Sequence, residues 1–170
     1  MLVDFFGYAG DCTISGRLDM TEGRLTDLLE GTSVVIVLDA RLHGFGGEPI
    51  EHVERLRLGR ADLFAVEAAG TAGSDARRIH TVRHLVRFAC GRYTIIGELH
   101  ALPGARPLAT LLAHRTMVPL TDCHVIYERD GAEEVRRAAV VIVNGLRIDS
   151  ADEIGLDDPD LERLALLRTT

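Results

Sequence analysis

The chain contains the same sequence pattern twice, about 80 residues apart, and this repeat restricts the folds open to it. A segment rich in Gly, Thr and Ile returns with Thr13 aligned on Thr94, a shift of 81 positions. Farther along, Asp39 aligns with Asp122 at a shift of 83 positions, and an apolar stretch follows each of them. Because these matches keep the same order with small gaps, the sequence predicts a tandem duplication in which both copies build the same unit.

Each copy opens with an alternation of apolar and polar residues that is typical of a strand with one buried face. A glycine stands inside this strand, Gly16 in the first copy and Gly97 in the second. The missing side chain allows a bend or a close approach of another backbone. Leucines spaced at i, i+3 and i+4 then predict a short helix over residues 22–29 and residues 106–113.

The remainder of each copy predicts three more strands. The first of these ends at Asp39 or Asp122, where we expect the carboxylate to accept backbone N–H bonds in a turn or bulge. A short turn separates the last two strands, and residues 56–59 of the first copy align with residues 140–143 of the second. In the second copy we expect the final strand over residues 146–148.

The second copy resembles an uncharacterised family of small bacterial domains over about its whole length. The family pattern is I-x-G-x-L-H, then a leucine-rich turn of helix, then F-x-P-L-T-D. Residues 93–100, 106–112 and 118–122 carry this pattern. The first copy departs from it, with Asp19 at the position of His100. No activity comes with this resemblance.

A more distant resemblance is to the Sm-like RNA-binding barrels. In that family a bent, glycine-containing strand leads to an L-x-L-x-D-A segment and then to a last pair of strands split by a polar turn. Residues 35–40, 58–63 and 140–148 are similar to these parts of the pattern. In this chain the helix follows the first strand, whereas in that family it precedes it. The resemblance implies a five-stranded barrel for each copy.

We therefore expect a mainly β (α+β) fold with two tandem small Sm/SH3-like β-barrels, each with a short helix after its first strand, and a C-terminal helix. In the tail, Asp158 is placed to cap that helix, and Pro159 suits its first position. The expected boundaries are 2–69 for the first barrel, 70–81 for a Gly/Ser linker, 82–150 for the second barrel and 151–170 for the acidic tail.

Charge alternates in sign along the chain. The formal net charge is −7, made up of −7 over residues 1–75, +5 over residues 76–148 and −5 over residues 149–170. All 19 Lys and Arg positions are Arg. The absence of lysine excludes a Schiff-base lysine, a P-loop lysine and a kinase lysine.

Three interpretations of this charge layout stay open. In the first, the first copy or the acidic tail folds onto the second copy and neutralises it, since opposite charges attract within about 8 Å at physiological salt. In the second, the basic stretch binds an external polyanion, which the acidic pI of about 5.5 disfavours. In the third, molecules associate head-to-tail through unpaired strand edges. The candidate partner-binding arginines of the basic stretch are Arg77, Arg78, Arg83, Arg87 and Arg92.

A few further side chains are candidates for contacts or chemistry. Phe45 lies in a Gly-rich stretch that predicts a hairpin loop with an exposed ring, a candidate partner contact. His80 and His84 have the i, i+4 spacing of helical metal ligands, but the alternation around them predicts a strand. We therefore expect no metal and no other cofactor. The three cysteines lie far apart without a C-x-x-C pair, which favours reduced thiols over a disulfide framework or a zinc site.

The function expected from these features is that of a non-enzymatic binding or assembly module of a bacterial cytoplasm, acting through protein–protein contacts or self-association into a homo-oligomer. The N-terminus lacks the Arg or Lys of a secretory or transit peptide, and no apolar run is long enough to span a bilayer. One alternative is an Sm-like nucleic-acid-binding protein that uses the Arg-rich central stretch. Another is a metal-dependent or other enzyme acting through the histidines, for which the sequence shows no catalytic constellation.

Overall fold

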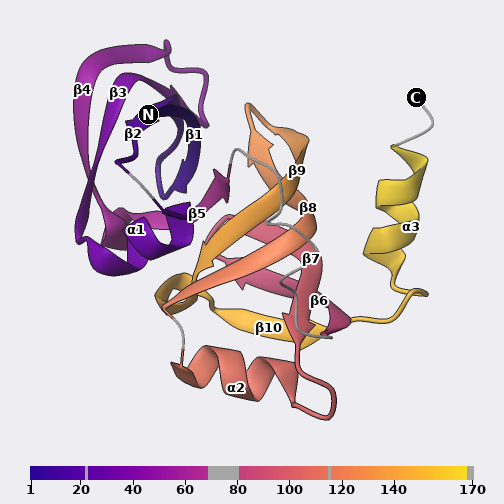
Figure 1. The fold of residues 1–170 in the computed structure, drawn as a ribbon. Helices are drawn as coiled ribbons and strands as arrows, with labels where there is room; N and C mark the ends of the chain where they lie inside the picture. Colours follow the sequence, from indigo (N-terminus) through magenta and orange to yellow (C-terminus); the bar gives the residue numbers. More distant parts are fainter. Residues whose placement is uncertain (22, 69–80, 115, 168–170) are drawn as a thin grey trace.

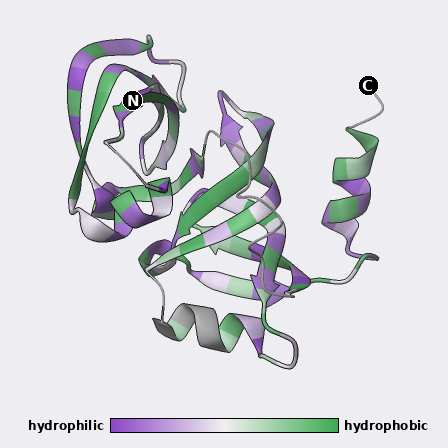
Figure 2. Cartoon of the chain, viewed as in Figure 1, coloured by the Kyte–Doolittle hydropathy of each residue, from purple (hydrophilic) through white to green (hydrophobic). Residues whose placement is uncertain are grey.

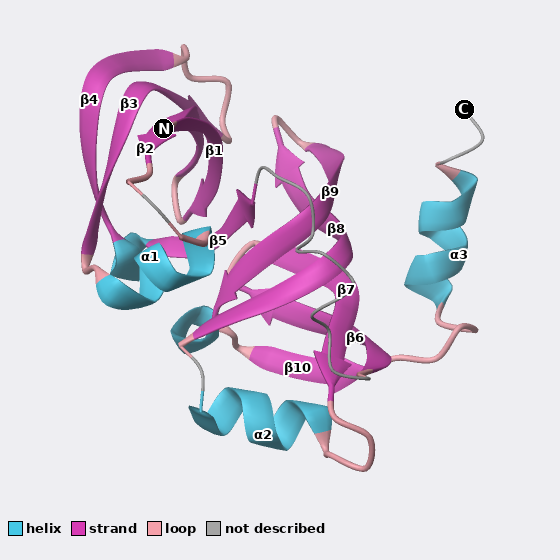
Figure 3. Cartoon of the chain, in the orientation of Figure 1, coloured by secondary structure: helices cyan, strands magenta, loops and turns pink. Residues whose placement is uncertain are grey.

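The computed structural model describes residues 1–21, 23–68, 81–114 and 116–167 of the chain. Ten strands form one antiparallel sheet in the order β10-β6-β7-β8-β9-β5-β1-β2-β3-β4, and the helices lie outside it (Figures 1 and 3). The strands are β1 (Leu2–Ala9), β2 (Cys12–Asp19), β3 (Val34–Gly44), β4 (Glu51–Gly59), β5 (Leu63–Ala68), β6 (Val82–Cys90), β7 (Tyr93–Ala101), β8 (Met117–Arg129), β9 (Ala132–Asn144) and β10 (Ser150–Glu153). The helices are α1 (Leu25–Gly31), α2 (Pro107–His114) and α3 (Pro159–Leu166), with single 3-10 turns η1 (Arg60–Asp62) and η3 (Gly145–Arg147).

The prediction of a mainly β fold is confirmed, but the prediction of two separate small barrels is wrong. β9 pairs with β8 on one side and, through residues 141–143, with β5 on the other. This ladder makes one continuous open sheet. The physical reason is that β5 and β9 would each present unpaired backbone N–H and C=O groups at an edge, and pairing satisfies both. Apolar burial favours the same arrangement, because Ala65, Val141 and Val143 are 1%, 0% and 0% exposed.

Residues 2–68 (the first half) and residues 82–153 (the second half) contain the same elements in the same order. Each half has five strands, with a helix between its second and third strands and a 3-10 turn between its fourth and fifth. The strand orders also correspond, β5-β1-β2-β3-β4 in the first half and β10-β6-β7-β8-β9 in the second. The predicted recurrence of one unit therefore matches the element order, while the duplication that would explain it stays a prediction.

The strand ladders align the two halves residue by residue. Thr13 and Thr94 occupy the same ladder position, as the sequence predicts. The sequence alignment of β4 on β9 is wrong by one residue. Leu56 pairs with Val37, and Val141 pairs with Leu120, the equivalent of Val37. Leu56 therefore corresponds to Val141, a shift of 85 positions, whereas the sequence alignment places Leu56 on Val140.

The recurring aspartates and glycines mark a bend in both halves. Asp39 and Asp122 have φ values of 50° and 49°, and the ladder beside each shifts register opposite Gly16 or Gly97. The predicted end of the strand at these aspartates is wrong, because β3 and β8 continue past them to their hairpins. A left-handed residue inside a strand produces a bulge, which bends the strand without ending it.

Both glycines lie against the neighbouring backbone at this bend. A Cβ on Gly16 would lie 2.8 Å from the carbonyl oxygen of Leu38, and one on Gly97 would lie 3.2 Å from the carbonyl oxygen of Thr121. The predicted close approach is therefore confirmed at both positions.

The helices lie close to their predicted ranges, but the last strand of the second half does not. α1 begins and ends two to three residues later than predicted, and α2 is displaced by one residue. Residues 145–147 form a 3-10 turn, and the final strand is Ser150–Glu153, which pairs with β6. The predicted start of α3 is confirmed, since Asp158 accepts a hydrogen bond from the Asp160 N–H and Pro159 is the first helical residue.

Two main hydrophobic cores support the sheet, and each contains residues from both halves. The core of the first half includes Met117 and Ile142 of the second half. The core of the second half includes Tyr8 and Ala65 of the first half. Hydrophobic and hydrophilic residues alternate along the strands around these cores (Figure 2). The halves are therefore joined by shared packing as well as by the β5–β9 ladder.

Candidate functional site

The sheet ends in two strands that pair on one side only among the described residues. β4 pairs with β3 and forms the outer edge of the first half, and β10 pairs with β6 at the opposite end of the sheet (Figure 1). β4 carries exposed Glu54, Arg55 and Arg57, whereas β10 carries Asp152 and Glu153. An edge strand presents backbone groups that are ready to pair with another chain.

The β5–β9 ladder and the side chains beside it (the internal joint) show how two such edges meet in this fold. Arg136 donates from Nε and Nη2 to the two carboxylate oxygens of Glu67 at 2.9 and 3.1 Å. The Arg136 guanidinium also lies 3.7 Å from the centroid of the Phe6 ring. Tyr8 donates from its hydroxyl to Glu67 Oε1 at 2.6 Å. Burial, together with the neighbouring carboxylate, holds the pKa of Tyr8 above its ordinary value, so the phenol remains a neutral donor.

The two free edges correspond in position to the two strands of the internal joint. β4 occupies in the first half the place that β9 occupies in the second. In the second half Ser150 of β10 pairs with Ala89 of β6, and in the first half Ala65 of β5 pairs with Tyr8 of β1. Since Tyr8 and Ala89 pair with Thr13 and Thr94, Ser150 and Ala65 are equivalent. The molecule therefore carries the same kind of edge pair twice, once joined inside the chain and once free at its two ends.

The predicted partner-binding arginines that the structure describes, Arg83, Arg87 and Arg92, make different contacts within the chain. Arg77 and Arg78 lie outside the described residues. Arg83 forms an ion pair with Glu98 at 3.4 Å. Arg87 and Arg92 contact different parts of the chain, the tail and the first half.

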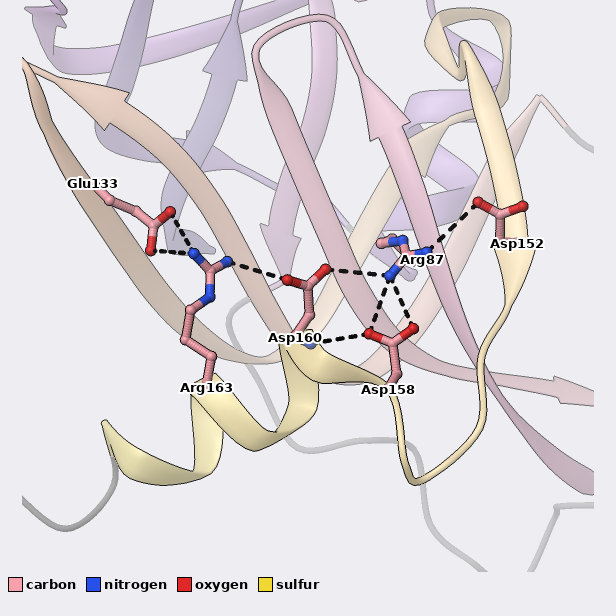
Figure 4. A network of polar contacts seen from close by, with 6 residues as sticks. All are labelled: Arg87, Glu133, Asp152, Asp158, Asp160 and Arg163. Carbon is pink, nitrogen blue, oxygen red and sulfur yellow. Dashed lines mark hydrogen bonds and ion pairs between the residues drawn. The ribbon is translucent and has the colours of Figure 1, made fainter.

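Arg87 is the centre of the contact between the acidic tail and the second half (Figure 4). Its Nη1 lies 3.0 Å from a carboxylate oxygen of Asp158 and 3.2 Å from one of Asp160. Arg163 of α3 donates to both oxygens of Glu133 on β9 at 3.0 and 2.9 Å. Leu164 of α3 packs on the sheet in a third, small apolar cluster. The interpretation that the acidic tail folds onto the basic half is confirmed for these residues.

Arg92 and Phe45, which come from different halves, contact each other. The Arg92 guanidinium lies 3.8 Å from the centroid of the Phe45 ring, and its Nε donates to the carbonyl oxygen of Gly10 at 3.1 Å. Phe45 is half-buried and packs beside Tyr93 and Tyr127 in the core of the second half. The prediction of an exposed Phe45 ring is therefore wrong, because the hairpin of the first half folds against the second half.

A groove runs beside the internal joint between the two halves. Its first part has a volume of about 380 Å³ and is lined by residues of β1, β2, β5 and β9. Its second part has a volume of about 240 Å³ and is lined mainly by residues of β2, β3, β8 and β9. Phe6, Ser15 and Arg136 line both parts. The second part is further lined by Thr13, Arg41, His43, Ile50, Tyr127, Arg129 and Glu134.

Arg129 lines the second part of this groove and joins the two halves. The residue is 5% exposed. Its Nη1 donates to the carbonyl oxygens of His43 and Gly44 at 2.9 and 2.7 Å, and its Nη2 donates to Thr13 Oγ1 at 2.8 Å. Glu134, whose side chain is about half exposed, lies 3.0 Å from Arg129 Nε. These contacts fix the β8–β9 hairpin against β2 and β3.

The histidines and cysteines that the sequence offers as candidates for chemistry lie at separate places in the structure. His84 lies on β6 as predicted, and its Nδ1 contacts Glu153 Oε1 at 2.8 Å, while His80 lies outside the described residues. Among the described residues, no three His, Cys, Asp or Glu side chains are grouped to hold a metal ion. Burial raises the pKa of the Cys12 thiol to about 11, and those of Cys90 and Cys123 to about 12.

The sequence predicts head-to-tail association through unpaired strand edges as one interpretation, but it does not identify β4 and β10 as those edges, and it does not predict the groove. The run of Ala, Val and Ile at residues 139–143 contains a usable signal, because a continuous apolar stretch is typical of a strand that is buried on both faces. That signal indicates that β9 is covered on both faces, but it does not identify β5 as its neighbour in the sheet. Arg41 and Ser15 carry no comparable signal, since their placement in the groove depends on the docking of the two halves.

In the described part of the chain, no helix combines the length and apolar character needed to cross a membrane. The chain shows no match to a protein-family model, a curated protein or a solved structure.

Proposed function

We propose that the protein is a non-enzymatic assembly module whose copies associate head-to-tail, with β4 of one copy paired to β10 of the next. The observation that carries this proposal is the internal joint, in which a β5 edge already pairs with a β9 edge. The free edges β4 and β10 occupy the equivalent positions in their own halves. Repetition of the same contact between molecules would satisfy both remaining edges. The correspondence of the halves also supports tandem duplication of one five-stranded unit.

The register of the internal joint, transferred to the free edges, brings opposite charges together. In the joint, Ala65 lies opposite Val143. The equivalent register places Ser150 of β10 opposite Leu58 of β4. Because the strands are antiparallel, Glu153, three residues later on β10, lies opposite Arg55, three residues earlier on β4. Directly opposed charges of opposite sign contribute roughly 0.2–1 kcal/mol to a strand pair. Arg57 lies diagonally from Glu153 on the same face, so the two arginines of β4 meet an acidic β10.

The contact between molecules is expected to be weaker than the internal joint. In the joint the opposed side chains are almost completely buried, as Val66 and Ile142 at 2% and 1% exposure show. At the free edges the corresponding positions hold Ala151 and the exposed Arg57. The association therefore depends on charge as well as on backbone hydrogen bonds, and salt screens it. It is also heterologous, so it produces rings or open chains of copies instead of a two-fold dimer.

The contacts of the central arginines favour assembly over nucleic-acid binding. Arg87 is surrounded by carboxylates of the tail, and Arg92 lies over Phe45. A phosphate backbone would have to displace these contacts before it reached the guanidinium groups. Arg83 remains at the surface, but it faces Glu98.

The experiment is a measurement of molar mass by light scattering, at increasing protein concentration and at low and high salt. We expect masses above one chain at low salt and a shift toward the single chain at high salt. Arg55→Glu and Glu153→Arg, each alone, should shift the equilibrium toward the monomer, and the two together should restore association because the opposed charges are exchanged. Arg24→Glu, an exposed charge reversal outside both edges, is the matched control. A strict monomer at every concentration would refute the proposal, as would equal association of the wild type and the two single variants.

A further inference from the structure

The second part of the groove between the halves is a polar cavity that the assembly proposal does not use. It opens on the face of the first half formed by β1, β2 and β3, and the β8–β9 hairpin closes one side. Cavities between two structural units are common places for small-molecule binding. Its volume of about 240 Å³ fits a small organic molecule.

The same sheet face occurs in the second half, where its character is the opposite. There it is apolar and is covered by Leu161 and Leu164 of α3. The strand ladders assign an equivalent in the first half to each of three apolar positions under α3. The equivalent pairs are Leu85 with Asp4, Ile96 with Ser15, and Ile126 with His43. The face that binds a helix in one half is therefore polar and open in the other.

The charges of the cavity do not balance, and the excess is positive. Three arginines line it against one glutamate, Glu134, which lies beside Arg129. Arg136 is neutralised by Glu67 from the adjoining part of the groove. Arg41 remains, and its side chain makes no hydrogen bond or ion pair with any other residue that the structure describes.

The groups around Arg41 complete a set of donors that suits an oxyanion. Arg41 lies opposite Ser15 in the β2–β3 ladder, so the two side chains point to the same face of the sheet. His43, two residues along β3, lies in the same cavity and is half-buried. A guanidinium beside a hydroxyl and an imidazole binds a carboxylate or a phosphate by charge-assisted hydrogen bonds. The Tyr127 ring and Ile50 provide an apolar wall on another side of the cavity.

We infer that this cavity binds the oxyanion group of a small organic molecule, a carboxylate or a phosphate monoester, with Arg41 as its main charged contact and the apolar body of the ligand against Ile50 and Tyr127. The bound group would neutralise the one positive charge that the protein leaves unpaired there. The cavity lies within one chain, so its occupation does not require the association of copies.

Calorimetric titration of the full chain with benzoate, phenyl phosphate and benzamide tests the inference. At low salt we expect saturable binding of benzoate or phenyl phosphate, and the stronger of the two identifies the kind of oxyanion. Benzamide has nearly the shape of benzoate without its charge, and it should not bind measurably. Arg41→Gln should weaken the binding at least tenfold, about 1.4 kcal/mol. Arg24→Gln should leave it unchanged.

Three results would overturn the assignment of an oxyanion site. These are the absence of binding by both anions up to about 10 mM, equal binding of benzamide and benzoate, and unchanged affinity in Arg41→Gln. Since Arg41 is exposed and unpaired among the described residues, its replacement should not disturb folding. The far-ultraviolet circular dichroism spectrum of each variant verifies that. Retention of binding in Arg55→Glu would separate the cavity from the assembly edges.

Discussion

Replacing Gly97 with alanine should destabilise the protein, because the added methyl group meets atoms that have no room to move. The new Cβ would lie 2.8 Å from Cys123 Sγ, 3.1 Å from Leu120 Cβ and 3.2 Å from the carbonyl oxygen of Thr121. All three atoms belong to β8, which is held between β7 and β9 at this point. Relief of the contacts would therefore require the β7–β8 ladder to separate at its bulge.

The expected cost follows from two opposing effects. Adding a methyl group to a well-packed interior typically costs about 1–3 kcal/mol. Replacing glycine also restricts the unfolded chain, which returns roughly 0.4–1 kcal/mol. We therefore expect the free energy of unfolding to fall by about 1–2 kcal/mol, and the thermal midpoint of a chain this long to fall by about 2–8 °C.

Urea denaturation followed by circular dichroism measures this change, with Gly31→Ala as the matched control. Gly31 is the last residue of α1, and a Cβ there would meet nothing within 4 Å. At such an unstrained position the replacement of glycine by alanine stabilises by roughly 0.4–1 kcal/mol, because it restricts the unfolded chain. The two substitutions should therefore have opposite signs. Equal stability of Gly97→Ala and the wild type would refute the close approach of β7 and β8 at this bend.

Three further outcomes are expected. Burial raises the thiol pKa of Cys90 and Cys123 from 9.0 to about 12, so the unfolded chain loses these protons first as the pH rises. The contribution of these two thiols to the free energy of unfolding should therefore be constant below about pH 9 and fall between about pH 9 and 12. Urea titrations at several pH values measure this fall, and a rise in the free energy of unfolding over that interval would contradict the reasoning. The same thiols should be unreactive toward Ellman's reagent at pH 8 until urea unfolds the protein, and rapid reaction of the native chain would show that they are accessible. Leu164→Ala should loosen α3, seen as faster amide hydrogen exchange in that helix, whereas Leu156→Ala, at a position 90% exposed, should not.

The local pattern of the sequence predicts most elements of the fold, because each strand and helix is determined by the spacing of its own apolar residues. The close approaches at Gly16 and Gly97 and the start of α3 at Pro159 are all local in this sense. The prediction fails at Asp39, where a polar residue was expected to end the strand. A bulge costs only one irregular residue, and the pairing on both sides of β3 continues beyond it.

The arrangement of the two halves could not be predicted from these local sequence patterns. Whether β5 closes a barrel with its own half or pairs with β9 depends on the competition between two edges, and both choices use the same apolar residues. The position of Phe45 depends on that choice, since the ring is half-buried only when the halves dock. The groove around Arg41 likewise exists only after docking. These features follow from long-range pairing, which the spacing of residues along one strand does not report.

The exchange of core residues between the halves has a consequence for protein engineering. A fragment of residues 1–68 would lack Met117 and Ile142 from its core, and a fragment of residues 82–167 would lack Tyr8 and Ala65. Each fragment alone would expose apolar surface together with a bare strand, and we expect it to be poorly soluble. Mixed, the two fragments present the complementary surfaces of the internal joint. The chain is therefore a candidate split-protein reporter, in which reconstitution of the fold signals that two fused partners have come together.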